Sequence, residues 1–192
     1  MASKRESSFI NMVLTLFLVA AVAALALGGV YTVTKEPIAI AKQKKLEAAI
    51  KAVLPEFDSI TTKKVADADG DSLTFYYADK SGENVGVAIK TYTNSGFSGK
   101  IELMVGLLKD GSISNTAVLA HKETPGLGDK MDKSKSDFPV QFMGKNPADF
   151  KLDVTKDGGD VDAITAATIS SRAFCDAVER AYVTYKNNGG SK

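Results

Sequence analysis

The hydrophobic and polar positions divide the chain into one long apolar run and a region of shorter, patterned segments. The run from Phe9 to Val33 carries no charge between Glu6 and Lys35. At a rise of about 1.5 Å per residue, a helix of this length crosses a hydrocarbon core of about 30 Å with some tilt. A cleavable signal peptide is the alternative, because the small residues of "AVAALALGG" could form a cleavage site. However, the apolar region of a signal peptide is usually shorter than this run. The pattern favours an uncleaved transmembrane helix over residues 9–33.

The charges beside this run predict its orientation. Lys4 and Arg5 precede it, and the positive-inside rule places such residues in the cytoplasm, although the lysines from Lys35 onward weaken the asymmetry. We expect a cytoplasmic N-terminus over residues 1–8. The protein is then a single-pass protein of the inner (cytoplasmic) membrane, with residues 34–192 forming one domain on the extracytoplasmic (periplasmic) side.

The segment "EPIAIAKQKKLEAAIKAVLPEF" repeats apolar residues at helical spacing until Pro55 stops the pattern. This predicts an amphipathic helix next to the membrane. Its lysines either contact lipid headgroups or form a solvated face. The apolar positions are Ile38, Ala41, Leu46, Ala49, Ile50 and Val53.

The remaining pattern predicts a sheet followed by a helix. The runs "SLTFYYA", "NVGVAIKTYT", "GKIELMVGLL" and "SISNTAVLA" are separated by short turns that contain glycine, which is typical of an antiparallel meander. The polar segment from "DKMDKSKSD" to "KNPADFKLDV" predicts irregular structure with one short helix after Asn146. The run "SSRAFCDAVERAYVTYKNNGG" has helical spacing and ends at Asn and Gly. The predicted class is α+β, an antiparallel sheet with flanking helices after a single N-terminal transmembrane helix.

Charge and cysteine content narrow the possible functions. Lys and Arg number 24 against 23 Asp and Glu, so the net charge of +1 gives no overall basic field for a nucleic acid. The single cysteine, Cys175, permits no internal disulfide and no Cys-based zinc or iron–sulfur site within this chain. Its place in the last helical pattern predicts a buried, inert thiol.

Catalytic and metal-binding patterns have little support. His121 is the only histidine, and neither a G-x-S-x-G elbow nor a Walker A pattern is present. We expect His121 to be a hydrogen-bonded structural residue or part of a site's rim rather than a general base. The cluster "DADGD" at residues 67–71 lacks the other spacings and the terminal Glu of a calcium loop, which favours a polar turn.

Two loops of small residues, with a smaller third one at "NSGFSGKI", are the best candidates for a ligand site. In "ETPGLGDK", Gly126 and Gly128 let the backbone approach a flat ligand, Pro125 stiffens the turn, and Leu127 offers an apolar contact. An ordinary tight loop is the alternative interpretation.

The second loop, "DAITAATISS", precedes the last helix. Ser170 or Ser171 could cap this helix, whose exposed amides and positive dipole end favour a phosphate. Thr168 would lie at that anion site.

These segments resemble the FMN-binding domain family. "DAITAAT" looks like the family's flavinylation motif, Asp-x-x-Ser/Thr-Gly-Ala-Thr, and "HKETPGLGDK" resembles the loop that accompanies it. "SGFSGKIELMVGL" matches a third family segment. Together with its N-terminal anchor, the chain is similar over essentially its whole length to the G subunits of Rnf-type ion-translocating electron transport complexes.

The resemblance implies a covalent cofactor. FMN would be attached through its phosphate to the hydroxyl of Thr168 by a separate flavin transferase, with Asp162 on the motif's acidic position. The "ETPGLG" loop would contact the isoalloxazine ring. The implied FMN-binding residues are Thr168, Thr165, Ala166, Ala167, Ser171, Glu123, Thr124, Gly126, Leu127 and Gly128.

Ala166 departs from the motif, because the family usually has Gly there. An alanine forced into the left-handed region would be strained at a functional site. We therefore expect an ordinary negative φ at Ala166, with its methyl group turned away from the phosphate.

The implied function is electron transfer within a membrane complex that couples ferredoxin and NAD to ion transport. The chain would be a redox subunit of this translocase rather than an independent enzyme, and would bind neither ferredoxin nor NAD itself. Its partners would be the other complex subunits, the flavin transferase and membrane lipid, without nucleic acid.

Two alternative functions stay open. One is the C subunit of a sodium-translocating NADH:quinone reductase, and the other is an anchored sensor or scaffold domain that binds FMN reversibly or not at all.

Overall fold

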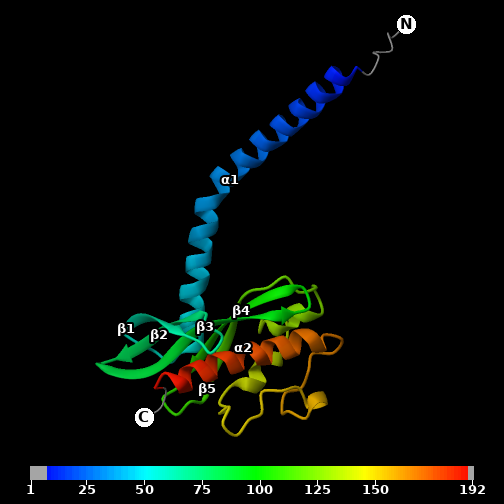
Figure 1. The fold of residues 1–192 in the computed structure, drawn as a ribbon. Helices are drawn as coiled ribbons and strands as arrows, with labels where there is room; N and C mark the ends of the chain where they lie inside the picture. The colour runs from blue at the N-terminus through cyan, green and yellow to red at the C-terminus, as the bar shows by residue number, and fades with distance from the viewer. Residues whose placement is uncertain (1–7, 190–192) are drawn as a thin grey trace. The chain divides into compact units, whose positions relative to one another are not determined.

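The computed structural model describes residues 8–189, and Figure 1 shows a long helix, a sheet and a C-terminal helix. The chain divides into two compact units between Lys44 and Lys45. The α+β class is confirmed. The elements are α1 (Phe9–Val53), β1 (Ser59–Ala66), β2 (Ser72–Lys80), β3 (Glu83–Gly96), β4 (Gly99–Leu107), β5 (Ile113–Ala120), the 3₁₀ helices η1 (Gly128–Met131), η2 (Phe138–Phe142) and η3 (Thr155–Asp157), and α2 (Thr168–Asn187).

Helix α1 is one continuous helix that includes both helices predicted for the N-terminal part of the chain. It is long and apolar enough to cross a membrane, and its most apolar stretch buries no residue. Pro37 lies inside it and removes one backbone hydrogen bond. The helix ends at Val53, just before Pro55 as predicted. Lys4 and Arg5, on which the predicted orientation rests, lie outside the described residues.

The sheet is an antiparallel meander with the strand order β1-β2-β3-β4-β5, which confirms the predicted topology. Strand β1 was not predicted. Its sequence "SITTKKVA" does not alternate between apolar and polar residues, and Val65 is the only residue of this strand that is buried. As an edge strand it carries Lys63 and Lys64, and charges of this kind discourage pairing with another chain.

The short helix predicted after Asn146 is wrong. The chain makes a single turn there, in which the Phe150 amide donates to the Asn146 carbonyl. The side chain of Asn146 also accepts a hydrogen bond from the Ala148 amide at 3.0 Å, and such local side-chain bonding competes with helix formation. The helical turns of this region are η1, η2 and η3 instead.

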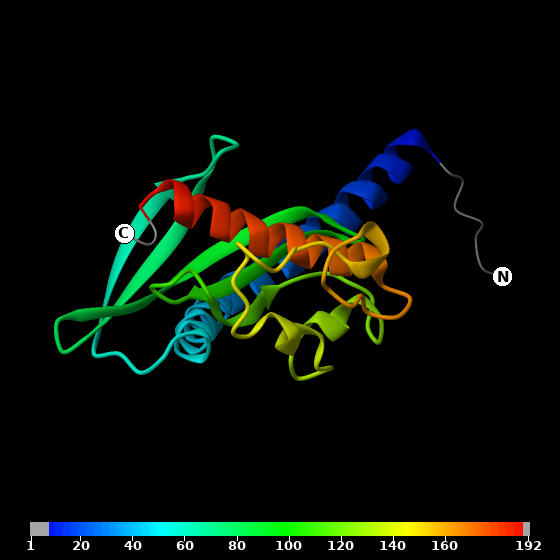
Figure 2. The same ribbon diagram turned by 90° about the horizontal axis from the view of Figure 1, so that it is seen from below.

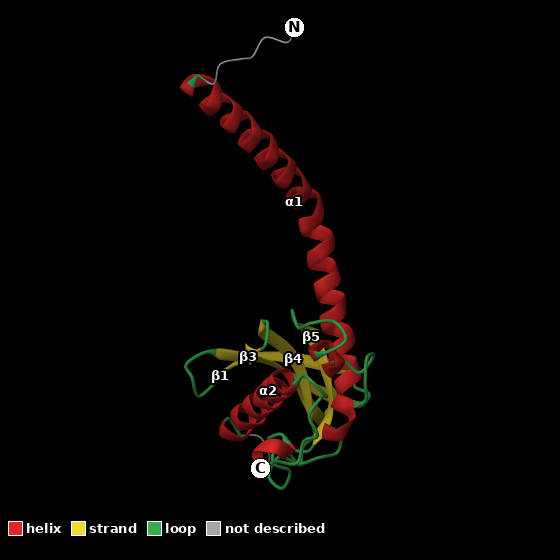
Figure 3. Ribbon diagram, turned by 90° about the vertical axis from the view of Figure 1, so that its right-hand side faces the viewer, coloured by secondary structure: helices red, strands yellow, loops and turns green. Residues whose placement is uncertain are grey.

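Helix α2 covers one face of the sheet, as Figures 2 and 3 show. Phe174 and Val178 of α2 pack with Phe75 and Leu103 of the sheet in the main core. Cys175 is also buried there, and burial raises the pKa of its thiol to about 12, consistent with the predicted inert thiol.

The opposite face of the sheet packs against the end of α1 within the second unit. Ala49, Ile50 and Val53 contact apolar side chains of the central strands in a second cluster. Gly106 of β4 has no room for a side chain, because a Cβ there would lie 1.9 Å from the Val53 carbonyl oxygen. The helix end therefore rests directly on the backbone of the sheet.

The "DADGD" segment is a polar turn, as predicted. The Asp67 carboxylate accepts hydrogen bonds from the Asp69 and Asp71 amides and from Arg180 of α2. Burial raises the pKa of Asp67, but the hydrogen bond and the charge of Arg180 outweigh burial and hold this pKa below its ordinary value. The turn thereby anchors the β1–β2 connection to α2.

Candidate functional site

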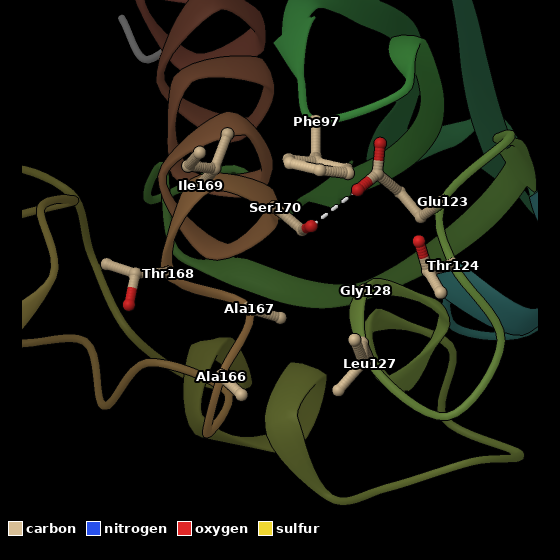
Figure 4. A pocket seen from close by; sticks show the side chains of 10 residues that line it. All are labelled: Phe97, Glu123, Thr124, Leu127, Gly128, Ala166, Ala167, Thr168, Ile169 and Ser170. Atoms are coloured by element: carbon tan, nitrogen blue, oxygen red, sulfur yellow. Dashed lines mark hydrogen bonds between the residues drawn. The ribbon is translucent and has the colours of Figure 1, made fainter.

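Three segments that are distant in sequence surround a cavity of about 290 Å³ (Figure 4). The turn between β3 and β4 contributes Phe97, the loop after β5 contributes residues of "ETPGLG", and the start of α2 contributes small residues. The lining residues are Phe97, Glu123, Thr124, Leu127, Gly128, Ala166, Ala167, Thr168, Ile169 and Ser170. The structure therefore brings together the two loops that the sequence singled out.

Glu123 connects the three segments. It is only 5% exposed, and its carboxylate accepts a hydrogen bond from the Ser98 amide at 2.8 Å and another from the Ser170 hydroxyl at 2.5 Å. The Glu123 amide in turn donates to Nδ1 of His121 at 3.1 Å. His121 is thus a hydrogen-bonded structural residue beside the site, as expected from the sequence.

Gly128 is required by this close packing. A Cβ at Gly128 would lie 2.5 Å from the Ser170 hydroxyl oxygen and 2.7 Å from the Glu123 carboxylate. The glycine predicted to allow a close approach to a ligand is therefore needed for a close approach between protein groups. Gly126, at φ +79°, takes the left-handed conformation in the exposed part of the same loop.

Ala166 lies in a tight turn at the entrance to α2. The Ala167 amide donates to the Ile164 carbonyl at 3.0 Å, which makes Ala166 the third of four turn residues. Its φ is +61°, so the expected negative φ is wrong. The third position of a type II turn requires a positive φ and favours Gly or Asn, which is a physical reason for a glycine there. This chain places a strained alanine in that position instead.

The predicted capping role of Ser170 or Ser171 is also wrong. Helix α2 begins at Thr168 with Ala167 as its N-cap, and no side chain caps it. Ser170 bonds to Glu123, while the Ser171 hydroxyl accepts from the Ile164 amide at 2.9 Å and donates to the Ala167 carbonyl at 3.0 Å. Both serines lie within the first turn. The Ser171 hydroxyl fixes the preceding loop and the Ser170 hydroxyl bonds to the loop after β5, so neither caps the helix end.

Thr168 is the first residue of α2 and belongs to the cavity wall. In Figure 4 Thr168 lies at the edge of the ten residues that line the cavity, and its side chain is turned away from Glu123. The first amides of a helix have no partner within the helix, and the dipole makes this end favourable for an anion. A phosphate on the Thr168 hydroxyl would therefore lie beside unpaired amides.

Three apolar side chains stand exposed around the cavity. Phe97 is 65% exposed, Ile169 is 47% exposed and Leu127 is 40% exposed. Figure 4 shows Phe97 and Ile169 on one side of the group and Leu127 on the other. Apolar walls with a few polar groups are typical of cofactor sites.

Four of the predicted site residues do not line the cavity: Thr165, Ser171, Gly126 and Asp162. Ser171 is buried behind it and holds the turn, whereas Thr165 and Gly126 are exposed. Asp162 is exposed too, and the Gln141 side chain bonds to both its amide, at 2.8 Å, and its carbonyl, at 3.1 Å. This pair fixes the backbone that presents the Asp162 carboxylate to solvent.

Sequence reasoning did not assign three lining residues to the ligand site: Phe97, Ile169 and Ser170, the last of which it named only as a candidate helix cap. The hairpin segment "SGFSGKI" was noted, and an aromatic residue between turn glycines was the available signal for Phe97. Ile169 and Ser170 belong to a helix whose starting residue the sequence did not fix. Among residues 8–189, no cluster of three His, Cys, Asp or Glu side chains could hold a metal ion.

Comparison with known proteins identifies the class first. Residues 96–183 match the FMN-binding domain family, and this range contains all three segments around the cavity. Fold and site together define an FMN-binding domain that follows a candidate membrane-spanning helix in the sequence.

The relatives extend the likeness to almost the whole chain. The G subunit of the ion-translocating oxidoreductase complex of Aliivibrio fischeri is 36% identical over 190 residues, covering 93% of this chain and 90% of the relative. The proteins of the same name from Vibrio atlanticus, 38% identical with 80% of each chain covered, and Shewanella oneidensis, 37% identical with 77% and 76% covered, are also similar. The chain belongs to the family of G subunits of ion-translocating oxidoreductase complexes.

Proposed function

We propose that this protein is the electron-carrying subunit of a membrane-bound, Rnf-type ferredoxin:NAD oxidoreductase, and that it holds FMN covalently through a phosphoester on Thr168. The observation that carries the proposal is the position of Thr168, at the uncapped start of α2 and in the wall of the cavity beside the "ETPGLG" loop. The family membership supports the complex and the cofactor class.

The residues around the cavity fit FMN. The uncapped helix end suits the phosphate, and the apolar walls at Phe97, Leu127 and Ile169 suit the flat ring system. Small side chains at Ala166 and Ala167 leave space between these two regions. When bound, FMN supplies the redox chemistry and passes electrons one at a time, while the protein contributes position and electrostatics.

The surroundings of Thr168 favour a tether rather than a catalyst. The buried carboxylate of Glu123 bonds to Ser170, and His121 bonds to the backbone, so neither group is held against the Thr168 hydroxyl. A separate flavin transferase would therefore supply the FMN phosphate in an activated form. The Thr168 oxygen would bond to phosphorus and lose its proton while the bond between phosphorus and the activating leaving group breaks. We assign Asp162 to recognition by this transferase, because its backbone is fixed while its carboxylate lies in solvent.

A denaturing gel tests the covalent cofactor. Full-length protein co-expressed with a flavin transferase should remain yellow and fluoresce in the gel, because a phosphoester survives unfolding. Flavin that is released on denaturation would support a reversible sensor domain, and a chain without flavin under native conditions would support a scaffold.

We propose further that the domain after residue 34 lies on the extracytoplasmic side of the inner membrane, where its partners are the other complex subunits and membrane lipid. The charges of Lys4 and Arg5 before the apolar run motivate this orientation. Protease added to spheroplasts should digest the region after residue 34, while a cytoplasmic marker protein stays intact. Protection until the cells are lysed would reverse the orientation.

A further inference from the structure

We propose that Phe97 forms a wall of the FMN ring site and that Glu123 is the positioning residue that holds Phe97 there. The inference rests on the proposed function and concerns the ring, whereas the covalent link concerns the phosphate. It arises from the one cavity-lining segment that lies outside both loops predicted from the sequence.

The exposure of Phe97 is the first observation. Phe97 and Ser98 form the two-residue turn between β3 and β4, and Phe97 is the most exposed large apolar side chain of the cavity at 65%. A large apolar surface left uncovered beside a concave site marks a contact with a ligand or partner. An aromatic side chain also stacks favourably on a flat ring.

The arrangement of the cavity walls is the second observation. In Figure 4 the Phe97 ring lies on one side of the cavity, and Leu127 lies on the other side. Leu127 comes from the loop that we assign to the flavin ring. A flat apolar group held between these walls would cover both side chains at once.

The attachment of the turn is the third observation. The amide of Ser98, which directly follows Phe97, donates to one oxygen of Glu123, and the Ser170 hydroxyl donates to the other. Because Glu123 is 5% exposed, water cannot easily replace either bond. The carboxylate thus ties the turn to the first turn of α2.

The glycines around this turn show that its backbone must stay close to the carboxylate. A Cβ at Gly96 would lie 2.3 Å from the Gly99 carbonyl oxygen and 2.9 Å from the Glu123 carboxylate. Gly99 has a φ of +98°, which favours glycine. With no side chain at position 96, the turn comes close enough for Glu123 to reach Ser98, and Phe97 lies at the cavity.

A tryptophan at position 97 provides the direct test. The chain contains no Trp, so Phe97→Trp introduces a single indole, which quenches flavin fluorescence by electron transfer only at close range. With full-length protein that carries one FMN by intact mass, we expect fluorescence several-fold below that of the native protein. The matched control is Ile60→Trp on strand β1, which is 38% exposed and outside the cavity, and it should leave the fluorescence unchanged.

Removal of the aromatic ring gives a second readout. Phe97→Ala should keep the covalent FMN, because Thr168 is separate, but lower the flavin fluorescence anisotropy and weaken the visible circular dichroism. Phe97→Tyr should restore both signals. Unchanged optical signals in Phe97→Ala, without quenching in Phe97→Trp, would overturn the inference and leave the covalent link standing.

The positioning role of Glu123 is tested by a double-mutant cycle. Glu123→Asp is too short to reach both Ser98 and Ser170, and it should lower the anisotropy in the same direction as Phe97→Ala. Added to Phe97→Ala, it should cause little further change, because both substitutions act through one wall. Fully additive changes would show that Glu123 does not act through Phe97. Native protein that carries no covalent FMN would instead refute the proposed function itself.

Discussion

Thr168→Val is expected to abolish the covalent attachment of FMN while the domain stays folded. Val has nearly the shape of Thr but no oxygen to esterify. Thr168 is partly exposed at the start of α2 and its hydroxyl does not cap the helix, so the free energy of unfolding should change by about 0.5 kcal/mol or less. Intact mass after co-expression with a flavin transferase should show near-complete addition of one FMN to the native chain and none to the variant.

Two further substitutions make this result specific to one hydroxyl. Thr168→Ser keeps the oxygen and should still be modified. Thr165→Val removes the other motif hydroxyl, which is exposed outside the cavity, and should also keep the flavin. A Thr168→Val chain that still carries one FMN would show that the tether lies elsewhere.

Substitutions at Ala166 are expected to change stability and flavin attachment together. Ala166→Leu places a bulky side chain on a left-handed backbone in the cavity wall beside Thr168. We expect it to block the approach of the phosphate and to reduce the flavinylated fraction at least several-fold. Full modification of this variant would show that position 166 does not line the FMN site.

Ala166→Gly should have the opposite effect. A residue with a Cβ costs roughly 1–2 kcal/mol in the left-handed region, and the greater freedom of Gly in the unfolded chain offsets part of the relief. The expected gain is roughly 0.5–1 kcal/mol in the free energy of unfolding, measured by urea denaturation, with flavinylation at least equal to that of the native chain.

Substitutions at two control positions show whether the stabilisation comes from relief of backbone strain or from the location of residue 166 beside the cavity. Ser81 is the other non-glycine residue with positive φ among the described residues, at +53°, and it lies in the β2–β3 turn. Ser81→Gly should stabilise the chain without changing flavinylation. Ala167 has a negative φ of −136° and is buried, so Ala167→Gly should not stabilise it. Equal stabilisation by Ala167→Gly would contradict an origin in backbone strain.

The strain at Ala166 was not predictable from its residue type. The Cβ of an alanine disfavours a positive φ, so a negative φ was the natural expectation. The positive φ arises because the Ala167 amide returns to Ile164 while the buried Ser171 hydroxyl holds the Ile164 amide and the Ala167 carbonyl. These contacts all lie within residues 164–171, and the glycine that the family usually has at position 166 was the available signal for a positive φ.

The sequence by itself determined the features whose physical cause is local. The uncharged run after Phe9 specifies a helix able to span a membrane, and strand alternation with glycine turns specifies the meander from β2 to β5. The motif "DAITAAT" and the loop "ETPGLG" identified two of the three segments of the candidate site, because each requires particular small residues in a fixed order.

The tertiary structure decided the rest, where the cause is contact between distant segments. It paired β1 with β2, although the sequence of β1 has little alternation of apolar and polar residues and only one of its residues is buried. It also joined Glu123 to Ser98 and Ser170, which connects three segments. It also brought Phe97 to the cavity, although Phe97 is separated from Thr168 by 71 positions (168 − 97). Sequence spacing carries no information about such proximity, because it depends on how the sheet and α2 pack together.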